Sequence, residues 1–215
     1  ALEEKVIELM TTALPDQIDR SSVVALCEGK RAAVLGPGMG LDELGRAWAR
    51  AFALHAPVPT IIDADGLTNL ADDGLSSLKN APAPRILTPH PGEAARLLGR
   101  PTAEVQADRY AAAGALAVRS GQVVILKGAR SIVAGGPALR VCAEGTAALG
   151  VAGTGDVLSG VIGALALTLA PLDAAIAGAL LHALAGIEAS TGDRGLIASE
   201  VADAVPVVLE RQRRH

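Results

Sequence analysis

The sequence predicts an α/β protein with a mainly parallel central sheet and helices on both faces. Short apolar runs alternate with helical patterns along the 215 residues. The runs lack strict alternation of polar and apolar residues, which is typical of strands buried on both faces. Half of the residues are hydrophobic, so the chain can bury a sizeable core. Because no repeat, low-complexity tract or linker interrupts the pattern, we expect one domain over residues 1–215.

Six short runs are the strand candidates. The first four are separated from one another by longer stretches in which helical patterns occur, as in a parallel sheet. The last two are separated only by Gly135-Gly136-Pro137, which predicts a hairpin. The expected strands are residues 32–35, 60–63, 85–88, 123–127, 131–134 and 139–143.

Helical periodicity fills the intervals between the strands. After the first strand, Leu44, Trp48, Phe52 and His55 recur at three- and four-residue spacing. A long helix is predicted over 103–119, with Thr102 as its cap and Gly121 just past its end. The remaining predicted helices are residues 156–169, 172–190 and 199–211.

The composition excludes several classes of protein. The net charge is −4, and the chain holds one Trp, one Tyr and one Phe. Single-strand nucleic-acid binders need stacking aromatics and a positive groove, so we expect no nucleic-acid partner. Cys27 and Cys142 have neither disulfide-framework nor zinc-site spacing. The first residues do not form a signal peptide, and the longest apolar run, 157–171, is shorter than the ~20 residues of a membrane span. We therefore expect a cytoplasmic protein with no membrane partner.

The glycine-rich loop Gly153-Thr154-Gly155-Asp156 precedes an apolar helix. Its glycines let N–H groups converge at the helix N-terminus, which makes an anion site. Asp156 stands where an N-cap would stand, and capping alone would explain it. Alternatively, its carboxylate accepts a proton from a substrate hydroxyl while the amides of Gly153 and Gly155 hold a phosphoryl group. The residues alone leave both interpretations open.

A second loop, Thr88-Pro89-His90-Pro91-Gly92-Glu93, is stiffened by two prolines and presents His90 and Glu93 three residues apart. Glu93 could hold a Mg²⁺-bound water near phosphate oxygens, or complement a helix dipole. His90 could touch substrate or hydrogen-bond the loop. Residue-level reasoning favours the structural interpretation of both.

Two further loops follow predicted strands. In the first, Lys127-Gly128-Ala129-Arg130-Ser131, the lysine suits phosphate contact or, equally, a snorkelling surface position. The second, Gly36-Pro37-Gly38-Met39-Gly40, is not a dinucleotide fingerprint because Leu41 replaces the third glycine, and the chain has no P-loop motif. A tight turn with close ligand approach fits this second loop.

Other polar residues are weaker candidates. Asp63 and Asp65 follow a strand, where a ligand contact is possible, but turn formation by Asp65-Gly66 is the favoured interpretation. His55 and His182 lie in helical patterns, so helix packing is expected for both.

Five segments occur in an order that resembles a known family. They are residues 63–67, 87–93, 124–129, 152–160 and 195–199. The chain resembles the ADP/ATP-dependent NAD(P)H-hydrate dehydratases, a branch of the ribokinase-like fold, over about residues 31–206. The string TPHPGE at 88–93 is specific to this branch, whereas GTGD at 153–156 marks the wider superfamily.

The resemblance implies a fold, a reaction and roles. The enzyme would phosphorylate the 6-hydroxyl of hydrated NADH or NADPH with ADP or ATP, and phosphate would then leave. Asp156 would be the base, and Gly153 and Gly155 the anion hole. The substrate contacts would be Gly38 or Gly40, with His90 and Asp156. Beside these implied roles, the loop residues themselves make Glu93 the candidate for Mg²⁺, directly or through water. The implied nucleotide contacts are Lys127, Gly128, Ala129, Arg130, Ser131 and Gly155.

Two features depart from the family pattern. Thr146 stands where a Gly-Asn-Pro type segment places an asparagine that positions the loop before residue 153. Family members also carry a first βα unit before the point where Ala1 falls, and a sheet without it would expose an edge. These departures motivate an alternative, a catalytically inactive nucleotide-binding module. A small-molecule kinase acting on a vitamin-like alcohol is a further alternative. The exposed edge and the Ala/Leu-rich last helices suggest a homo-oligomer. A link to an NAD(P)H-hydrate epimerase is expected by family analogy only.

Overall fold

The computed structural model of the chain describes residues 10–71, 75–192 and 194–213. Within them, six strands form one sheet in the order β1-β2-β3-β4-β5-β6. The first four strands pair in parallel, and the last two pair antiparallel as the predicted hairpin. The mainly parallel sheet is therefore confirmed. The strands are β1 Ala33–Leu35, β2 Thr60–Ile62, β3 Arg85–Leu87, β4 Val123–Leu126, β5 Ile132–Gly135 and β6 Ala138–Val141.

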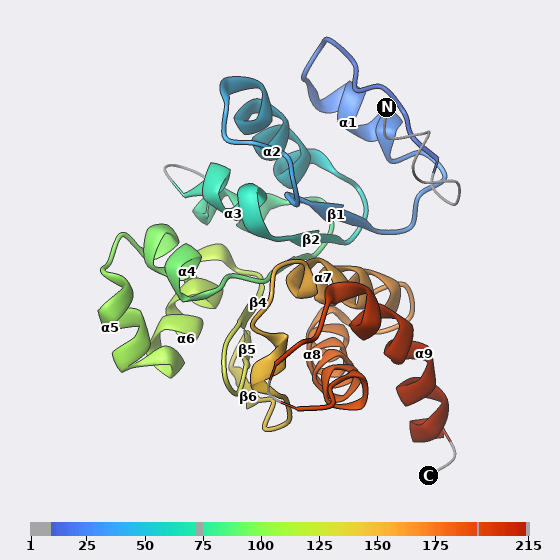
Figure 1. Cartoon of the computed structure of the whole chain (residues 1–215). Helices are drawn as coiled ribbons and strands as arrows, with labels where there is room; N and C mark the ends of the chain where they lie inside the picture. Colours follow the sequence, from blue (N-terminus) through green and yellow to red (C-terminus); the bar gives the residue numbers. More distant parts are fainter. Residues whose placement is uncertain (1–9, 72–74, 193, 214–215) are drawn as a thin grey trace.

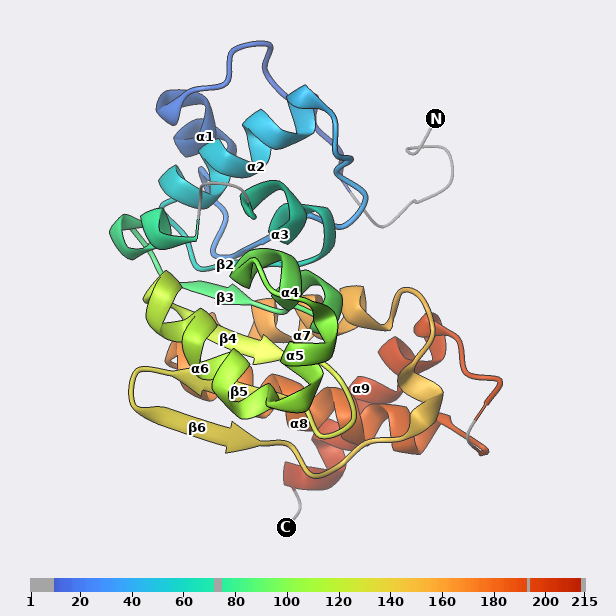
Figure 2. The same cartoon turned by 90° about the vertical axis from the view of Figure 1, so that its left-hand side faces the viewer.

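Helices cover both faces of the sheet (Figures 1 and 2). Alternate residues of the inner strands point to opposite faces, as the pleat requires. Ile62 and Leu87 pack in the core cluster of α2 to α6, whereas Ile61 and Ile86 pack against α7 and α8. The helices are α1 Arg20–Leu26, α2 Glu43–His55, α3 Ala64–Leu70, α4 Pro91–Leu98, α5 Thr102–Ala107, α6 Arg109–Ser120, α7 Thr154–Leu165, α8 Pro171–Ala189 and α9 Ala198–Arg213. Short 3₁₀ turns occur at η2 Ser76–Asn80 and η3 Ala147–Leu149.

The predicted long helix over 103–119 is wrong in one respect, because it is broken at Asp108. There the backbone leaves the helical region (φ −141°, ψ 82°), and the Asp108 carboxylate accepts a hydrogen bond from Ala111 N at 2.9 Å. Asp108 thus ends α5 and caps α6. Thr102 is the first residue of α5 rather than its cap, which is Pro101. Gly121 ends α6 in the left-handed conformation, as predicted.

The predicted turn at Asp65-Gly66 is also wrong, since both residues lie in the first turn of α3. Gly66 packs against the end of β1, where an added Cβ would lie 2.8 Å from Leu35 O. Only glycine lets α3 start so close to the end of β1. This contact brings the carboxyl ends of β1 and β2 together.

Strand β1 is an edge of the sheet within the described residues, and its Val34 is 43% exposed. One described helix, α8, is long and apolar enough to cross a membrane by length and composition alone. It packs against α7, α9 and strands β4 and β5, which is the environment of a core helix. The apolar run 157–171 covers most of α7, the connection after it and the first residue of α8, rather than a single helix.

Candidate functional site

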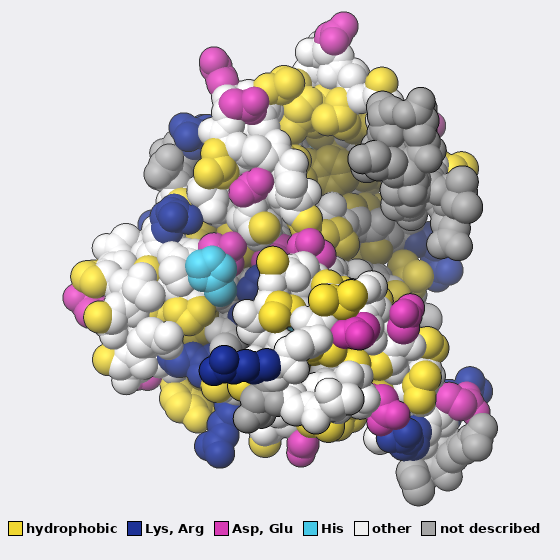
Figure 3. All heavy atoms as spheres, in the orientation of Figure 1, with side chains coloured by type: hydrophobic (Ala, Val, Ile, Leu, Met, Phe, Trp, Pro, Cys, Tyr) yellow, Lys and Arg dark blue, Asp and Glu magenta, His cyan; other side chains and the backbone are white. Residues whose placement is uncertain are grey.

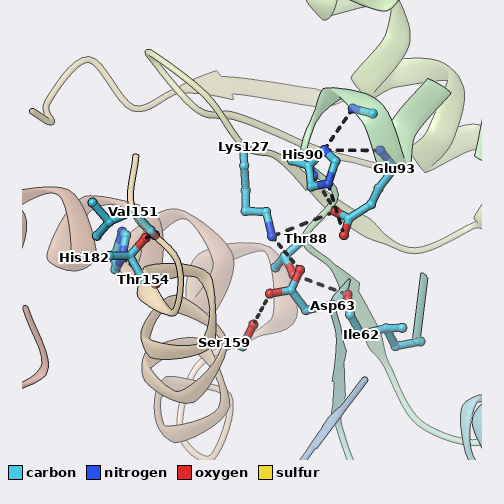
Figure 4. Close-up of polar contacts among 11 residues, drawn as sticks. Ile62, Asp63, Thr88, His90, Glu93, Lys127, Val151, Thr154, Ser159 and His182 are labelled. Atoms are coloured by element: carbon cyan, nitrogen blue, oxygen red, sulfur yellow. Dashed lines mark hydrogen bonds and ion pairs between the residues drawn. The ribbon is translucent and has the colours of Figure 1, made fainter. Parts of the chain in front are cut away.

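The carboxyl ends of β2, β3 and β4 bring a lysine between two carboxylates. Lys127 Nζ lies 2.5 Å from Asp63 Oδ1 and 4.0 Å from Glu93 Oε2 (Figure 4). Ser159 Oγ, from α7, donates to the other Asp63 oxygen at 3.1 Å. The Lys127 side chain therefore points inward, and the snorkelling interpretation is wrong. Its buried partner is Asp63, for which the sequence indicated only a weak candidate ligand contact.

Buried charges in this cluster are compensated by neighbouring side chains. Asp63 is almost fully buried, and the Lys127 ammonium and the Ser159 hydroxyl compensate its charge. Burial raises the pKa of the Glu93 carboxyl, while the nearby Lys127 cation opposes the rise. The cluster holds one ammonium against two carboxylates.

His90 and Glu93 form a capping box at the start of α4. His90 Nδ1 accepts from Gly92 N at 3.0 Å and from Glu93 N at 3.4 Å, and Glu93 Oε2 accepts from His90 N at 2.7 Å. Both residues thus have the structural role that the sequence favoured. They differ in exposure, since the His90 side chain is 56% exposed and that of Glu93 only 8%. The His90 ring remains open to a ligand, whereas Glu93 is largely occupied.

Helix α7 begins earlier than predicted, and Asp156 is not its N-cap. The cap is Gly153, in the left-handed conformation (φ +88°), and within the described part of the chain no capping side chain bonds the first amides of the helix. Asp156 lies in the first helical turn and is exposed. Gly155 faces the lysine cluster, because a Cβ there would lie 3.4 Å from Lys127 Nζ and from Asp63 Oδ2. An uncapped helix N-terminus beside an ammonium is a favourable anion environment.

A cavity of about 480 Å³ opens beside this helix N-terminus. Its volume lies in the range of small-molecule sites. All six residues that the resemblance assigned to the nucleotide line it. Its other walls come from residues 142–147, Leu149 and Gly150, the start of α7 and the middle of α8. Gly38, Gly40, His90 and Asp156 do not line this cavity.

The loop of residues 36–40 is fastened to α3 beside the cluster. At Gly36 (φ +124°) an added Cβ would lie 1.9 Å from Asp63 O, so the loop needs glycine there. Gly40 N donates to Asp65 Oδ2 at 2.9 Å, and Asn69 Nδ2 donates to Gly40 O at 2.9 Å. Gly38 (φ +67°) is exposed, with open space at its Cα. Asp65 therefore anchors the loop. On the face of the molecule that Figure 3 shows, acidic side chains lie beside an exposed histidine.

A sequence profile described as NAD(P)H-hydrate dehydratase matches residues 1–206. The chain belongs to the NAD(P)H-hydrate dehydratase family. It is 39% identical over 200 residues to the bifunctional NAD(P)H-hydrate repair enzyme of Escherichia coli (strain K12), covering 89% of this chain and 38% of that protein. The ADP-dependent (S)-NAD(P)H-hydrate dehydratase of Neisseria meningitidis is 41% identical over 197 residues, covering 87% of this chain and 66% of that protein. The chain thus spans about two fifths of the first of these relatives.

Solved structures agree with this family and fold. The ADP/ATP-dependent NAD(P)H-hydrate dehydratase of Bacillus subtilis, co-crystallised with ATP/Mg²⁺ and soaked with CoA, superposes with a TM-score of 0.72 at 30% identity, covering 84% of this chain and 66% of that one. A ribokinase-like superfamily protein of Enterococcus faecalis has a TM-score of 0.71 at 22% identity, covering 89% of this chain and 66% of that one. The ribokinase-like fold is therefore confirmed.

Thr146, at the position where the resemblance predicts an asparagine, caps a local turn. Its Oγ1 accepts from Ala148 N at 3.2 Å at the start of η3. Threonine hydroxyls and asparagine amides both act as caps, so threonine can make the interaction that an asparagine would make here. Thr154 Oγ1 then fastens the start of α7 to Leu149 O at 2.8 Å and Val151 O at 3.0 Å. The loop before α7 is thus held at both ends.

Sequence reasoning missed the position of His182 at the cavity, because its helical pattern predicted only packing. It projects from α8, lines the cavity, and places Nε2 2.8 Å from Thr154 O (Figure 4). Burial lowers the pKa of its imidazole, which favours the neutral ring. A neutral ring that donates from Nε2 keeps Nδ1 as an acceptor. The only sequence signal was a histidine inside an Ala/Leu-rich helix.

Proposed function

We propose that this protein dehydrates hydrated NADH or NADPH, with ADP or ATP as the phosphoryl donor. The observation that carries the proposal is the position of the cavity. It is lined by Lys127, Gly128, Ala129, Arg130 and Ser131, and it meets the uncapped N-terminus of α7 at Gly155. A nucleotide in this cavity would direct its terminal phosphate toward the α7 amides and the Lys127 ammonium. Phosphoryl transfer needs chiefly such positioning and charge stabilisation.

The substrate side lies across Lys127 from the cavity. There, Gly38, Gly40 and His90 would contact the hydrated dinucleotide, with Asp156 at the border between the two sides. A carboxylate placed beside the substrate hydroxyl can act as a general base and accept its proton. Gly153 leaves the α7 amides free for the transferred group.

The reaction has two steps in this proposal. Asp156 takes the proton of the 6-hydroxyl, whose oxygen bonds to the terminal phosphorus while the bond from phosphorus to the departing AMP or ADP breaks. The C–O bond at position 6 then breaks, phosphate leaves with the bonding electrons, and the adjacent carbon loses a proton. The double bond of the reduced nicotinamide is thereby restored. The amides of Gly153 and Gly155, at the start of α7, stabilise the phosphoryl charge in the first step.

Magnesium fits this site only together with the nucleotide. The described residues hold no group of three or more His, Cys, Asp or Glu side chains suited to a metal, and Glu93 already accepts a hydrogen bond from His90 N. Mg²⁺ often takes its ligands from phosphate oxygens and water, with few carboxylates. Glu93 would therefore contact the ion through water. The ion would neutralise phosphate charge.

The wider biology is proposed by analogy. The E. coli relative is named a bifunctional repair enzyme, which supports a link between this chain and an NAD(P)H-hydrate epimerase. We also propose a cytoplasmic location, since its substrates are soluble coenzymes, and a homo-oligomeric assembly.

The test is recovery of the reduced-nicotinamide absorbance when the protein meets hydrated NADH, Mg²⁺ and ADP or ATP. Recovery should require the nucleotide, and Asp156→Asn should remove it. A folded protein that binds ADP yet restores no absorbance would refute the proposed activity and favour the inactive-module alternative.

A further inference from the structure

The guanidinium of Arg109 donates hydrogen bonds to the backbone of the loop of residues 127–131. Arg109 Nη1 donates to Ala129 O at 2.6 Å, and Nη2 donates to Leu126 O at 3.2 Å and Lys127 O at 3.3 Å. Arg109 is the first residue of α6, directly after the break at Asp108. The helix break at Asp108, which the periodicity of the sequence did not predict, therefore sets the position of Arg109.

The loop adopts a conformation that local preference does not favour. Gly128 has φ +146° and Arg130 has φ +58°, both in the region that L side chains rarely adopt. A Cβ on Gly128 would lie 2.8 Å from Arg109 Nη2, so glycine also makes room for the guanidinium. Contacts from outside the loop must maintain such a shape. The three hydrogen bonds from Arg109 supply them.

Because Arg109 holds these carbonyl groups in place, it also fixes the direction of the N–H groups that follow them. In a trans peptide, the C=O of one residue and the N–H of the next point in opposite directions. The chain has no cis peptide among its described residues. With Lys127 O and Ala129 O turned toward Arg109, the N–H groups of Gly128 and Arg130 point away from it. Neither amide has a backbone or side-chain acceptor among the described residues, and both residues line the cavity.

We propose that Arg109 is a positioning residue for the nucleotide, which aims the Gly128 and Arg130 amides at its phosphate oxygens. The inference rests on the proposed function, since it specifies how the nucleotide is held. Two amides beside the Lys127 and Arg130 cations form an anion-binding nest. Arg109 itself would not touch the ligand. Its effect is pre-organisation, so it should govern nucleotide affinity more than the chemical step.

The experiment compares Arg109→Ala and Arg109→Lys with Arg119→Ala. Arg119 lies on the same helix and donates to one carbonyl, Leu97 O at 3.1 Å, away from the cavity. ADP and ATP affinities are measured by calorimetry, alongside thermal unfolding with and without nucleotide, and kcat and KM.

We expect Arg109→Ala to weaken nucleotide binding about tenfold or more and to raise the nucleotide KM, with kcat at saturating nucleotide within about threefold. Arg109→Lys should weaken binding by a smaller factor, because an ammonium lacks the planar fork that reaches several carbonyls at once. Arg119→Ala should bind like the wild type.

If Arg109→Ala binds nucleotide as tightly as the wild type and only its melting temperature falls, Arg109 has a purely structural role. That result would overturn the inference and leave the proposed function standing. If Arg109→Ala does not fold, Arg109→Lys decides the question by the same comparison. A folded wild type that binds neither ADP nor ATP would overturn the proposed function together with this inference.

Discussion

Adding one methyl group at Gly155 tests whether the gap between α7 and Lys127 is a ligand site. The Cβ of Gly155→Ala would lie 3.4 Å from both Lys127 Nζ and Asp63 Oδ2, which is ordinary van der Waals contact. Gly155 is also helical, in the first turn of α7. The folded protein can therefore accept the methyl without strain. A glycine-to-alanine change at such a position stabilises a protein by about 0.4–1 kcal/mol through the unfolded state.

The same methyl group removes the space that a phosphate oxygen needs between the helix amides and the ammonium. Loss of one such stabilising contact costs about 10²–10³-fold in turnover. We therefore expect Gly155→Ala to lose about that much activity, while its melting temperature stays the same or rises by a few degrees, since 1 kcal/mol shifts a chain of this size by about 2–4 °C.

The matched control is Gly160→Ala, in the same helix but with nothing within 4 Å of the added Cβ. It should gain a similar amount of stability, about 0.4–1 kcal/mol, and keep its turnover. The assay is thermal unfolding alongside recovery of reduced-nicotinamide absorbance with ADP. Turnover of Gly155→Ala within about threefold of wild type would refute the anion-site reasoning.

Three further predictions follow from the site. Asp156→Asn should bind nucleotide and unfold like the wild type but lose turnover, as measured by calorimetry, thermal unfolding and absorbance recovery; near-normal turnover would remove Asp156 from the mechanism. Thr146→Asn should keep turnover within about threefold because either side chain can cap η3, whereas Thr146→Ala should lose about 1 kcal/mol of stability; equal melting temperatures for both variants would contradict the capping role. The pKa of His182 is lowered by burial from its ordinary 6.5, so below that pH the unfolded chain binds a proton that the folded chain does not. Its contribution to stability should be present above pH 6.5 and be lost as the pH falls toward the folded-state pKa. Unfolding from pH 8 to 5 should show a smaller acid loss for His182→Gln, and an identical loss would contradict this assignment.

Much of the fold could be predicted because its strands are short, apolar and buried on both faces. Ile61 and Ile62 illustrate the reason: both neighbours are apolar since each face of the sheet carries helices. Loops at the ends of such strands converge whatever their sequence, so the meeting of Lys127 with the start of α7 followed from topology.

Features that depend on side-chain contacts across the chain could not be predicted this way. The helix break at Asp108 needs a local cap that competes with a strong helical pattern. His90 acts as the cap of α4 through an imidazole nitrogen, which no common capping rule signals. The partners Asp63 and Lys127 are 64 residues apart, and His182 reaches the site only because α8 packs on α7.

The most direct measurement of the central claim is the stoichiometry of phosphorus products during repair of hydrated NADH, followed by phosphorus NMR with ADP as donor. The proposed mechanism predicts one AMP and one inorganic phosphate for each NADH restored, with none formed in the absence of the hydrated substrate. A stable phosphorylated product without restored NADH would contradict the dehydratase and indicate a kinase of the same fold.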